Sequence, residues 1–288
     1  MLRPDYNQHF LATSNRPQNF IVDASLDNRF SGYPKLQALT SEMTELVAGA
    51  AHPALGLCAD LGVSPIEYLG YQFDSILIDP PWEEYALRSL TPQIFWSWEE
   101  ISRLRVDLIA GYPSFCFLWC GSRHVEEGMA CLAQWGFKRV EDICWLKTNR
   151  SRVGPPEPRL SPDEVLHSTV EHCLVGLRGS GLRRSADTHA VMANVDCDVI
   201  LAEQPADLCD TAKPDEIYEI IERLSLGTRR LELFGRRLRD GWVTVGNEIV
   251  ENNFSIELLS HYYANIPRFV PTTAGVEAQR PRTPPKTR

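Results

Sequence analysis

The fold of this chain is decided by one stretch, Phe73-Asp74-Ser75-Ile76-Leu77-Ile78-Asp79-Pro80-Pro81-Trp82. Its apolar run is rich in Ile and Leu, which predicts a buried parallel strand that the two prolines end at once. Asp79 and Trp82 would then lie at the carboxyl end of that strand. Open α/β sheets place their ligands at this end, so we expect a binding site here.

The residues that end this strand suit the binding of a planar amine. Asp79 can accept a hydrogen bond from an exocyclic NH2 group, and the carbonyl of Pro80 can accept a second one. Pro81 adds rigidity, and Trp82 can stack on the ring, as enzymes that act on extruded bases require. The alternative is a purely structural one, in which the strand is followed by a Pro-Pro turn and a half-buried Trp.

Strands and helices are expected to alternate around this stretch. We expect further strands near residues 55–60, 114–120, 142–147, 172–177, 199–203, 230–234 and 242–245. Helices are expected near residues 34–50, 96–108, 124–135 and 214–224, with Ser97 as the N-cap of the second. This alternation predicts an α/β fold with a doubly wound, mostly parallel sheet flanked by helices.

The composition predicts one main domain with two extensions. The chain has 288 residues and 43% hydrophobic content, enough to bury one large core. We expect an N-terminal extension with one helix at residues 1–54, the main domain at 55–266, and a basic, disordered tail at 267–288. No stretch approaches the roughly 18 apolar residues of a membrane span, and no signal peptide is expected.

Charge and cysteine content limit the partners. The net charge of −9 argues against a free-standing nucleic-acid binder, because phosphate contacts need a basic surface. The eight cysteines are scattered, and no pair has the two-residue gap of a zinc knuckle. We therefore expect reduced core thiols and no metal site, in a nuclear or cytosolic protein.

Several further motifs follow in order along the chain. They lie at residues 16–20 (RPQNF), 117–121 (FLWCG), 141–149 (EDICWLKTN), 193–196 (ANVD), 213–218 (KPDEIY) and 232–236 (ELFGR). Together with residues 79–82 (DPPW), they resemble the MT-A family of eukaryotic S-adenosylmethionine-dependent N6-adenine methyltransferases. The resemblance covers residues 5–265 and is closest to the partner-subunit branch, called methyltransferase-like fourteen, of the mRNA N6-adenosine (m6A) methyltransferase heterodimer.

This resemblance implies a Rossmann-like methyltransferase fold with a permuted order of motifs. The catalytic motif precedes part of the cofactor-binding apparatus, which explains why no Gly-x-Gly-x-x-Gly follows the first strand. By resemblance, Asp60 and Leu61 occupy positions that hold the adenine of S-adenosylmethionine, and Arg236, Asn247 and Glu248 occupy those that meet its ribose. Their carboxylate, carboxamide and guanidinium groups suit sugar hydroxyls and ring amines.

The resemblance also bears on whether the chain is catalytic. Transfer of a methyl group to N6 of adenine is mostly a matter of positioning, and Asp79, Pro80, Pro81 and Trp82 match the family's catalytic motif. The active subunit's pattern has a Lys at the position of Val170, a His at that of Leu238 and a Gln at that of Glu248.

These departures favour a non-catalytic, RNA-positioning subunit that pairs with a catalytic subunit of the same family in the nucleus. The alternative is a catalytic N6-adenine methyltransferase acting on RNA or DNA through residues 79–82. A third alternative is an interaction protein with no link to methylation. Residues 79–82 occur in some partner-branch members as well, so they do not decide between the first two.

Five basic residues are expected to bind the RNA backbone. They are Lys138, Arg139, Arg178, Arg183 and Arg184, all placed in loops by the strand assignment. A local basic cluster can bind phosphates even on an acidic protein. The alternative is that these residues belong to ordinary solvated loops.

Overall fold

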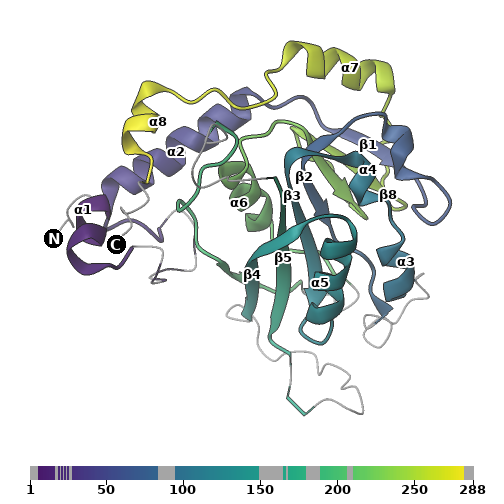
Figure 1. Cartoon of the computed structure of the whole chain (residues 1–288), viewed down its shortest axis with the longest axis horizontal. Coiled ribbons are helices and arrows are strands. Elements are labelled where there is room, and N and C mark those ends of the chain that lie inside the picture. The colour runs from purple at the N-terminus through teal and green to yellow at the C-terminus, as the bar shows by residue number, and fades with distance from the viewer. Residues whose placement is uncertain are drawn as a thin grey trace.

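An eight-stranded sheet forms the centre of the molecule, with strand order β1-β8-β7-β2-β3-β5-β4-β6 (Figure 1). The computed structural model describes residues 6–16, 19, 21, 23, 25, 28–83, 95–148, 165–166, 168–179, 189–205 and 210–281. The strands are β1 (Leu55–Cys58), β2 (Phe73–Ile78), β3 (Ala110–Gly121), β4 (Lys138–Thr148), β5 (Val170–Arg178), β6 (Val199–Glu203), β7 (Arg230–Leu233) and β8 (Trp242–Gly246).

Helices lie on both faces of this sheet and at one end of it. They are α1 (Tyr6–Thr13), α2 (Pro34–Gly49), the short 3-10 helix η2 (Ile66–Leu69), α3 (Trp98–Ser102), α4 (Val106–Ile109), α5 (Val125–Gln134), α6 (Glu216–Leu224), α7 (Ile256–Asn265) and α8 (Ala274–Gln279). None of the helices in the described ranges is both long enough and apolar enough to cross a bilayer.

The sheet is parallel except for β5. This strand runs antiparallel to β3 and to β4, whereas the other paired strands are parallel. The predicted α/β class is therefore confirmed. The antiparallel direction of β5 was not predicted from the sequence. It brings the start of β5 to the side of the sheet where the neighbouring strands β3 and β4 end.

The central strand β2 separates two cores. All six of its residues are buried, as expected for a strand with neighbours on both sides and helices on both faces. Ile76 and Ile78 belong to a cluster that includes residues of α3, α5 and α7, whereas Leu77 packs in a second cluster with Ile217 and Ile221 of α6. This alternation follows from the two-residue period of a strand.

One expected helix is divided into two. The N-cap predicted at Ser97 is present and is part of a capping box, since its hydroxyl accepts from the backbone of Glu100 and the Glu100 carboxylate accepts from the backbone of Ser97. The helix nevertheless ends at Ser102, and α4 begins only at Val106. Helix α7 follows the last strand and was not expected from the sequence.

The two ends of the described chain pack against each other. The hydroxyl of Tyr6 donates to the backbone carbonyl of Gln279, and Thr273 donates to Glu42 of α2. Val270 and Val276 are buried in one cluster with residues of α2, and Figure 1 shows α1, α2 and α8 side by side.

Residues 267–281, within the tail expected to be disordered, include α8 and pack against the rest of the chain. Their average composition is polar, but two buried valines anchor them.

We expect Val276→Ala to lower the free energy of unfolding by about 1–3 kcal/mol, because the side chain is fully buried and its loss leaves a cavity. Val250→Ala is the matched control, since Val250 is 94% exposed and the same change there should cost less than about 0.5 kcal/mol. Urea unfolding of both variants measures the difference. Equal effects would show that α8 does not stabilise the fold.

Candidate functional site

The residues singled out by sequence follow four adjacent strands. Asp60 comes after β1, Asn247 after β8, Arg236 after β7 and Asp79 after β2. These strands are parallel neighbours in the sheet, so the residues that follow them lie together at the carboxyl ends of the strands. We call this side of the sheet the carboxyl edge. This is the edge at which open α/β sheets bind their ligands.

A buried row of alternating charges lies at this edge. Lys213, just before α6, places Nζ 3.1 Å from Asp79 Oδ1 and 3.1 Å from Glu171 Oε2. Lys147, near the end of β4, places Nζ 2.6 Å from Glu171 Oε1. The four side chains are only 7–16% exposed. We call Asp79, Lys213, Glu171 and Lys147 the ion-pair row.

Burial and neighbouring charges shift the titration of these groups. Burial raises the pKa of Asp79 above its ordinary value, and the positive charges of Lys213 and Arg236 oppose this shift. Burial also acts to raise the pKa of Glu171, but Lys213 and Lys147 together lower it to about 2. Glu171 is therefore the firmly ionised member of the row, held between two cations.

A further buried carboxyl group lies close to Asp79. Glu232 of β7 accepts a hydrogen bond of 2.7 Å from the hydroxyl of Tyr218. Burial raises the pKa of Glu232 to about 7, and the negative charge of Asp79 adds to the effect. No cation in the described part of the chain forms an ion pair with Glu232 as Lys213 does with Glu171.

The cavity beside Asp79 is very small. It has a volume of about 30 Å³ and is lined by residues that include Asp79, Trp119, Lys213, Tyr218, Glu232 and Arg236. A buried water needs roughly 10–15 Å³ of such space, so the cavity holds one or two water molecules. This space is too small for a purine, and a second cavity of about 630 Å³ shares Ala212, Lys213 and Arg237 with it.

The other two groups expected to bind an amine are also engaged within the protein. The Pro80 carbonyl accepts a hydrogen bond of 2.8 Å from the backbone of Trp82. Trp82 is only 2% exposed, and its indole N–H donates to the carbonyl of Trp119 over 2.7 Å. The indole thus packs in the core, where its N–H has an acceptor, and the stacking of Trp82 on a base stays a prediction.

The residues assigned to the cofactor lie in a more open part of the edge. Asp60 and Glu248 are exposed, whereas Leu61 is buried in the core. Arg236 Nε lies 3.5 Å from Glu248 Oε2, and Arg236 also donates to the hydroxyl of Thr211. Exposed carboxylates suit the hydroxyls of a ribose, so these residues fit the nucleoside part of S-adenosylmethionine. The cavity at Asp79, of about 30 Å³, is too small for its methionine part.

A strained turn positions Arg236. Phe234 has φ 63°, in the left-handed region that bulky residues rarely adopt. The turn directly follows β7 and brings Arg236 back to the edge, where it meets Glu248 and Thr211. Residues held in such conformations cluster at functional sites, which agrees with the place assigned to this motif.

Three of the residues expected to bind RNA lie at the opposite edge of the sheet from Asp79. Lys138 and Arg139 are exposed at the start of β4, and Arg178 ends β5, so none of the three is in a loop as predicted. Arg178 is half-buried and donates to the carbonyl of Asp107 over 2.6 Å, which is a structural contact.

The remaining two, Arg183 and Arg184, lie outside the described residues.

Lys147, Glu171, Lys213 and Glu232 are functional residues of this site that were not predicted from the sequence. The lysines lie within quoted motifs, EDICWLKTN and KPDEIY, so their presence was visible. Their pairing with Glu171 depends on the antiparallel direction of β5, which places Glu171 opposite Gly121 at the end of β3. No local pattern in the sequence indicates that direction.

Comparison with known proteins agrees with this geometry. The sequence model of the MT-A70 family matches residues 73–248, which include β2, the ion-pair row and the turn after β7. The chain belongs to the MT-A70 family. Family membership implies chemistry that depends on S-adenosylmethionine.

Several characterised members of the MT-A70 family resemble the chain. It is 44% identical over 291 residues to the N(6)-adenosine-methyltransferase non-catalytic subunit METTL14 of Drosophila melanogaster, covering 98% of this chain and 72% of that protein. METTL14 of Danio rerio is 43% identical, with coverage of 98% and 62%. The chain is 34% identical over 244 residues to the human catalytic subunit METTL3, with coverage of 80% and 38%. It thus spans only 62–72% of the length of these METTL14 proteins.

We expect Glu232→Gln to remove a pH dependence of stability. The pKa of Glu232 is raised from its ordinary 4.5 to about 7, so the folded protein keeps a proton that the unfolded chain has lost between these values. Wild-type stability therefore falls as the pH rises from 5 to 7. The variant keeps the acceptor for Tyr218, and its stability relative to wild type should rise by roughly 2–3 kcal/mol between pH 5 and 8. Urea unfolding across this range measures it, and parallel curves would contradict it.

Glu171→Gln is the matched control, with the opposite sign. Because the pKa of Glu171 is lowered to about 2, its ionised form stabilises the fold above the ordinary pKa, and this contribution is lost as the pH falls towards 2. The variant should be destabilised at pH 7, and its difference from wild type should shrink between pH 5 and 3.

Proposed function

We propose that this chain is the non-catalytic subunit of a nuclear mRNA N6-adenosine methyltransferase. In this proposal it forms a heterodimer with a catalytic MT-A70 subunit, which it supports, and it helps to position the RNA. The observation that carries the proposal is the ion pair between Asp79 and Lys213 beside a cavity of about 30 Å³. The acceptor that methyl transfer requires is already occupied by a cation of the same chain.

The pairing of Asp79 with Lys213 matters because of the chemistry of methyl transfer. The lone pair of the adenine amine is delocalised into the ring, so catalysis needs acceptors that hold the amine in place. Asp79 is bound to Lys213, and the Pro80 carbonyl is bound to Trp82. Breaking a buried ion pair by displacing one partner costs roughly 3–5 kcal/mol, since the other charge is left without compensation.

Glu171 also holds Lys213 in place, because Lys213 cannot leave Asp79 without losing its contact with this second carboxylate. Its Nζ lies 3.1 Å from both groups. At the cofactor edge, Arg236 is paired with Glu248, and Leu238 packs close to Gly56 of β1. We infer that the chain binds S-adenosylmethionine weakly or not at all, while an active partner binds it.

The names of the relatives support the same assignment. The METTL14 relatives are described as non-catalytic, and their similarity covers 98% of this chain. METTL3 is described as catalytic, and its similarity covers 80%. That both kinds of subunit belong to one family supports a pairing of this chain with a partner of its own fold. The retained Asp79-Pro80-Pro81-Trp82 favours the second candidate, a catalytic methyltransferase acting on RNA or DNA.

We expect Asp79→Asn to leave methyl transfer by the heterodimer within a few-fold of the wild-type rate. A carboxylate that positions the reacting amine would instead lose about 100-fold or more. The measurement is methylation of an adenosine-containing RNA by the purified heterodimer, after size-exclusion chromatography confirms assembly. Asp215→Asn is the control, because Asp215 is exposed and lies outside the ion-pair row.

A 100-fold loss in the intact heterodimer would overturn the non-catalytic assignment. Micromolar binding of S-adenosylmethionine by the isolated chain in a calorimetric titration would also favour the catalytic alternative.

The proposed RNA contact is tested with Arg183 and Arg184, an adjacent pair of positive charges. We expect their replacement by Glu to weaken RNA binding by the heterodimer. The slope of the logarithm of the binding constant against the logarithm of the salt concentration should fall in magnitude by up to about two, because up to two fewer counterions are released. Base preference should change little, since phosphate contacts do not read sequence. Binding measured against salt concentration gives the slope, and Arg105→Glu, at an exposed site, is the control. An unchanged slope would exclude this pair from the RNA interface.

A further inference from the structure

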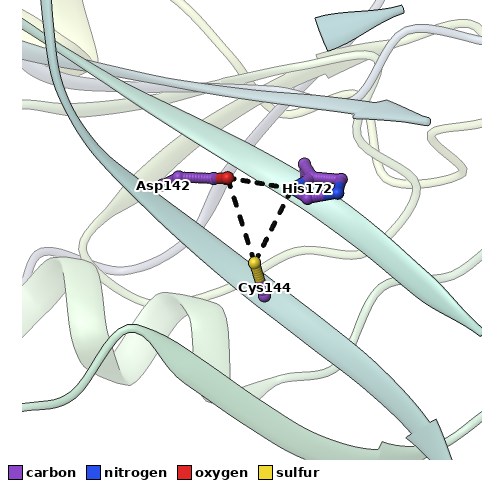
Figure 2. A group of neighbouring side chains, drawn as sticks. All are labelled: Asp142, Cys144 and His172. Carbon is purple, nitrogen blue, oxygen red and sulfur yellow. Dashed lines mark hydrogen bonds and ion pairs between the residues drawn. The ribbon is translucent and has the colours of Figure 1, made fainter. Parts of the chain in front are cut away.

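A second polar cluster lies on the other face of the sheet from the ion-pair row. Figure 2 shows Asp142 and Cys144 of β4 next to His172 of β5, with their side chains directed towards one another. His172 Nδ1 lies 2.9 Å from Asp142 Oδ2 and 3.6 Å from Cys144 Sγ, and Cys144 Sγ lies 3.9 Å from Asp142 Oδ2. In the described residues this is the one group of three possible metal ligands within 4.8 Å of one another.

Strand register explains how three residues of different type come together. Cys144 is paired directly with His172 across the antiparallel β4 and β5. Asp142 lies two positions before Cys144, so both project from the same face of β4. Glu171 of the ion-pair row is next to His172 and therefore projects from the opposite face. The proposed role of the chain makes no use of the Asp142–Cys144–His172 cluster.

The arrangement does not suit nucleophilic catalysis. A Cys–His–Asp relay uses both ring nitrogens, one for the thiol and the other for the carboxylate. Here the thiol and the carboxylate both approach Nδ1 of His172. The three atoms instead converge on a single point between them.

The distances do suit a tetrahedral metal ion. Bonds of about 2.0–2.3 Å at tetrahedral angles place the ligand atoms roughly 3.4–3.6 Å apart. The two distances that involve Cys144 are 3.6 and 3.9 Å, and the shorter 2.9 Å contact of Asp142 with His172 opens by a small side-chain rotation.

A second observation points to a missing ligand. Asp142 Oδ1 is buried and has no hydrogen-bond partner in the part of the chain that the structure describes. A buried carboxylate oxygen without a partner is costly, and a cation bound to the carboxylate would compensate it.

We propose that Asp142, Cys144 and His172 form a binding site for a divalent transition-metal ion, with Zn²⁺ as the ion that fits best. The combination of one sulfur, one nitrogen and one oxygen ligand favours zinc over Mg²⁺ or Ca²⁺, which prefer oxygen alone. Three protein ligands leave the fourth position to water. The ion would join β4 to β5, the strand that carries Glu171, and would stabilise the fold by its binding free energy.

The test uses the purified chain, cleared of metal with a chelator and then titrated with Co²⁺ and with Zn²⁺. We expect one equivalent of Co²⁺ to give the intense visible bands of a tetrahedral site and a thiolate charge-transfer band, and Zn²⁺ to displace it. Cys144→Ser should remove the charge-transfer band and weaken binding at least tenfold. Cys58→Ser, which changes an exposed thiol on β1, should leave both unchanged.

A measurement on the unchanged protein covers the case in which Cys144→Ser does not fold. Alkylation of wild-type thiols, followed by mass spectrometry of the peptides, should show that Zn²⁺ protects Cys144 and that Mg²⁺ does not. Absence of protection, or of stoichiometric Co²⁺ binding, would overturn the proposal. Equal loss of the charge-transfer band in Cys58→Ser would also overturn it, because the ion would then be bound elsewhere.

Discussion

A single lysine between two buried carboxylates organises the functional edge of this protein. Lys213 contacts Asp79 at the end of β2 and Glu171 at the start of β5. Each carboxylate is expensive to bury alone, and each has its charge compensated by the same ammonium group. The contact requires that the end of one strand and the start of another meet at one edge, which only the antiparallel direction of β5 allows. Topology and electrostatics are thus coupled at this point.

This coupling gives the residues of the catalytic motif partners within the protein. The four residues of the family's catalytic motif are all present, yet both acceptors expected to bind an amine, Asp79 and the Pro80 carbonyl, have partners inside the protein, and so has the indole N–H of Trp82. Asp79 contributes to stability through its ion pair, and Trp82 contributes as a core side chain. The motif residues therefore have roles in the folded structure that do not depend on catalysis. Presence of the motif is weak grounds for assigning activity.

Much of the fold could be predicted from the sequence, because its determinants are local. The apolar run of β2 with its two prolines, the cap at Ser97 and the periodicity of α2 are each readable within a few residues. The direction of β5 could not be predicted, since an apolar strand pattern is the same in either direction. The order of the C-terminal segment was missed because two buried valines count for little in a composition dominated by Pro, Thr and Arg.

In the candidate site, too, local features could be predicted from the sequence and contacts between distant segments could not. Asp79 was placed at the carboxyl end of its strand by the rule for open α/β sheets, and the residues after β1, β7 and β8 were assigned by family resemblance, whereas the partners of Asp79 come from distant segments. Burial of Trp82 depends on the carbonyl of Trp119 in the next strand.

The strand order has a consequence for how the chain folds as it is made. Strand β2 receives β3 as a neighbour soon after synthesis, but its other neighbour, β7, is complete only at Leu233. Until the ribosome has passed that point, this fully buried central strand has one unpaired flank. An unpaired strand edge is a template for aggregation, and distant partners pair slowly. The nascent chain is therefore most exposed to misassembly, and to capture by chaperones, during the long interval between these two strands.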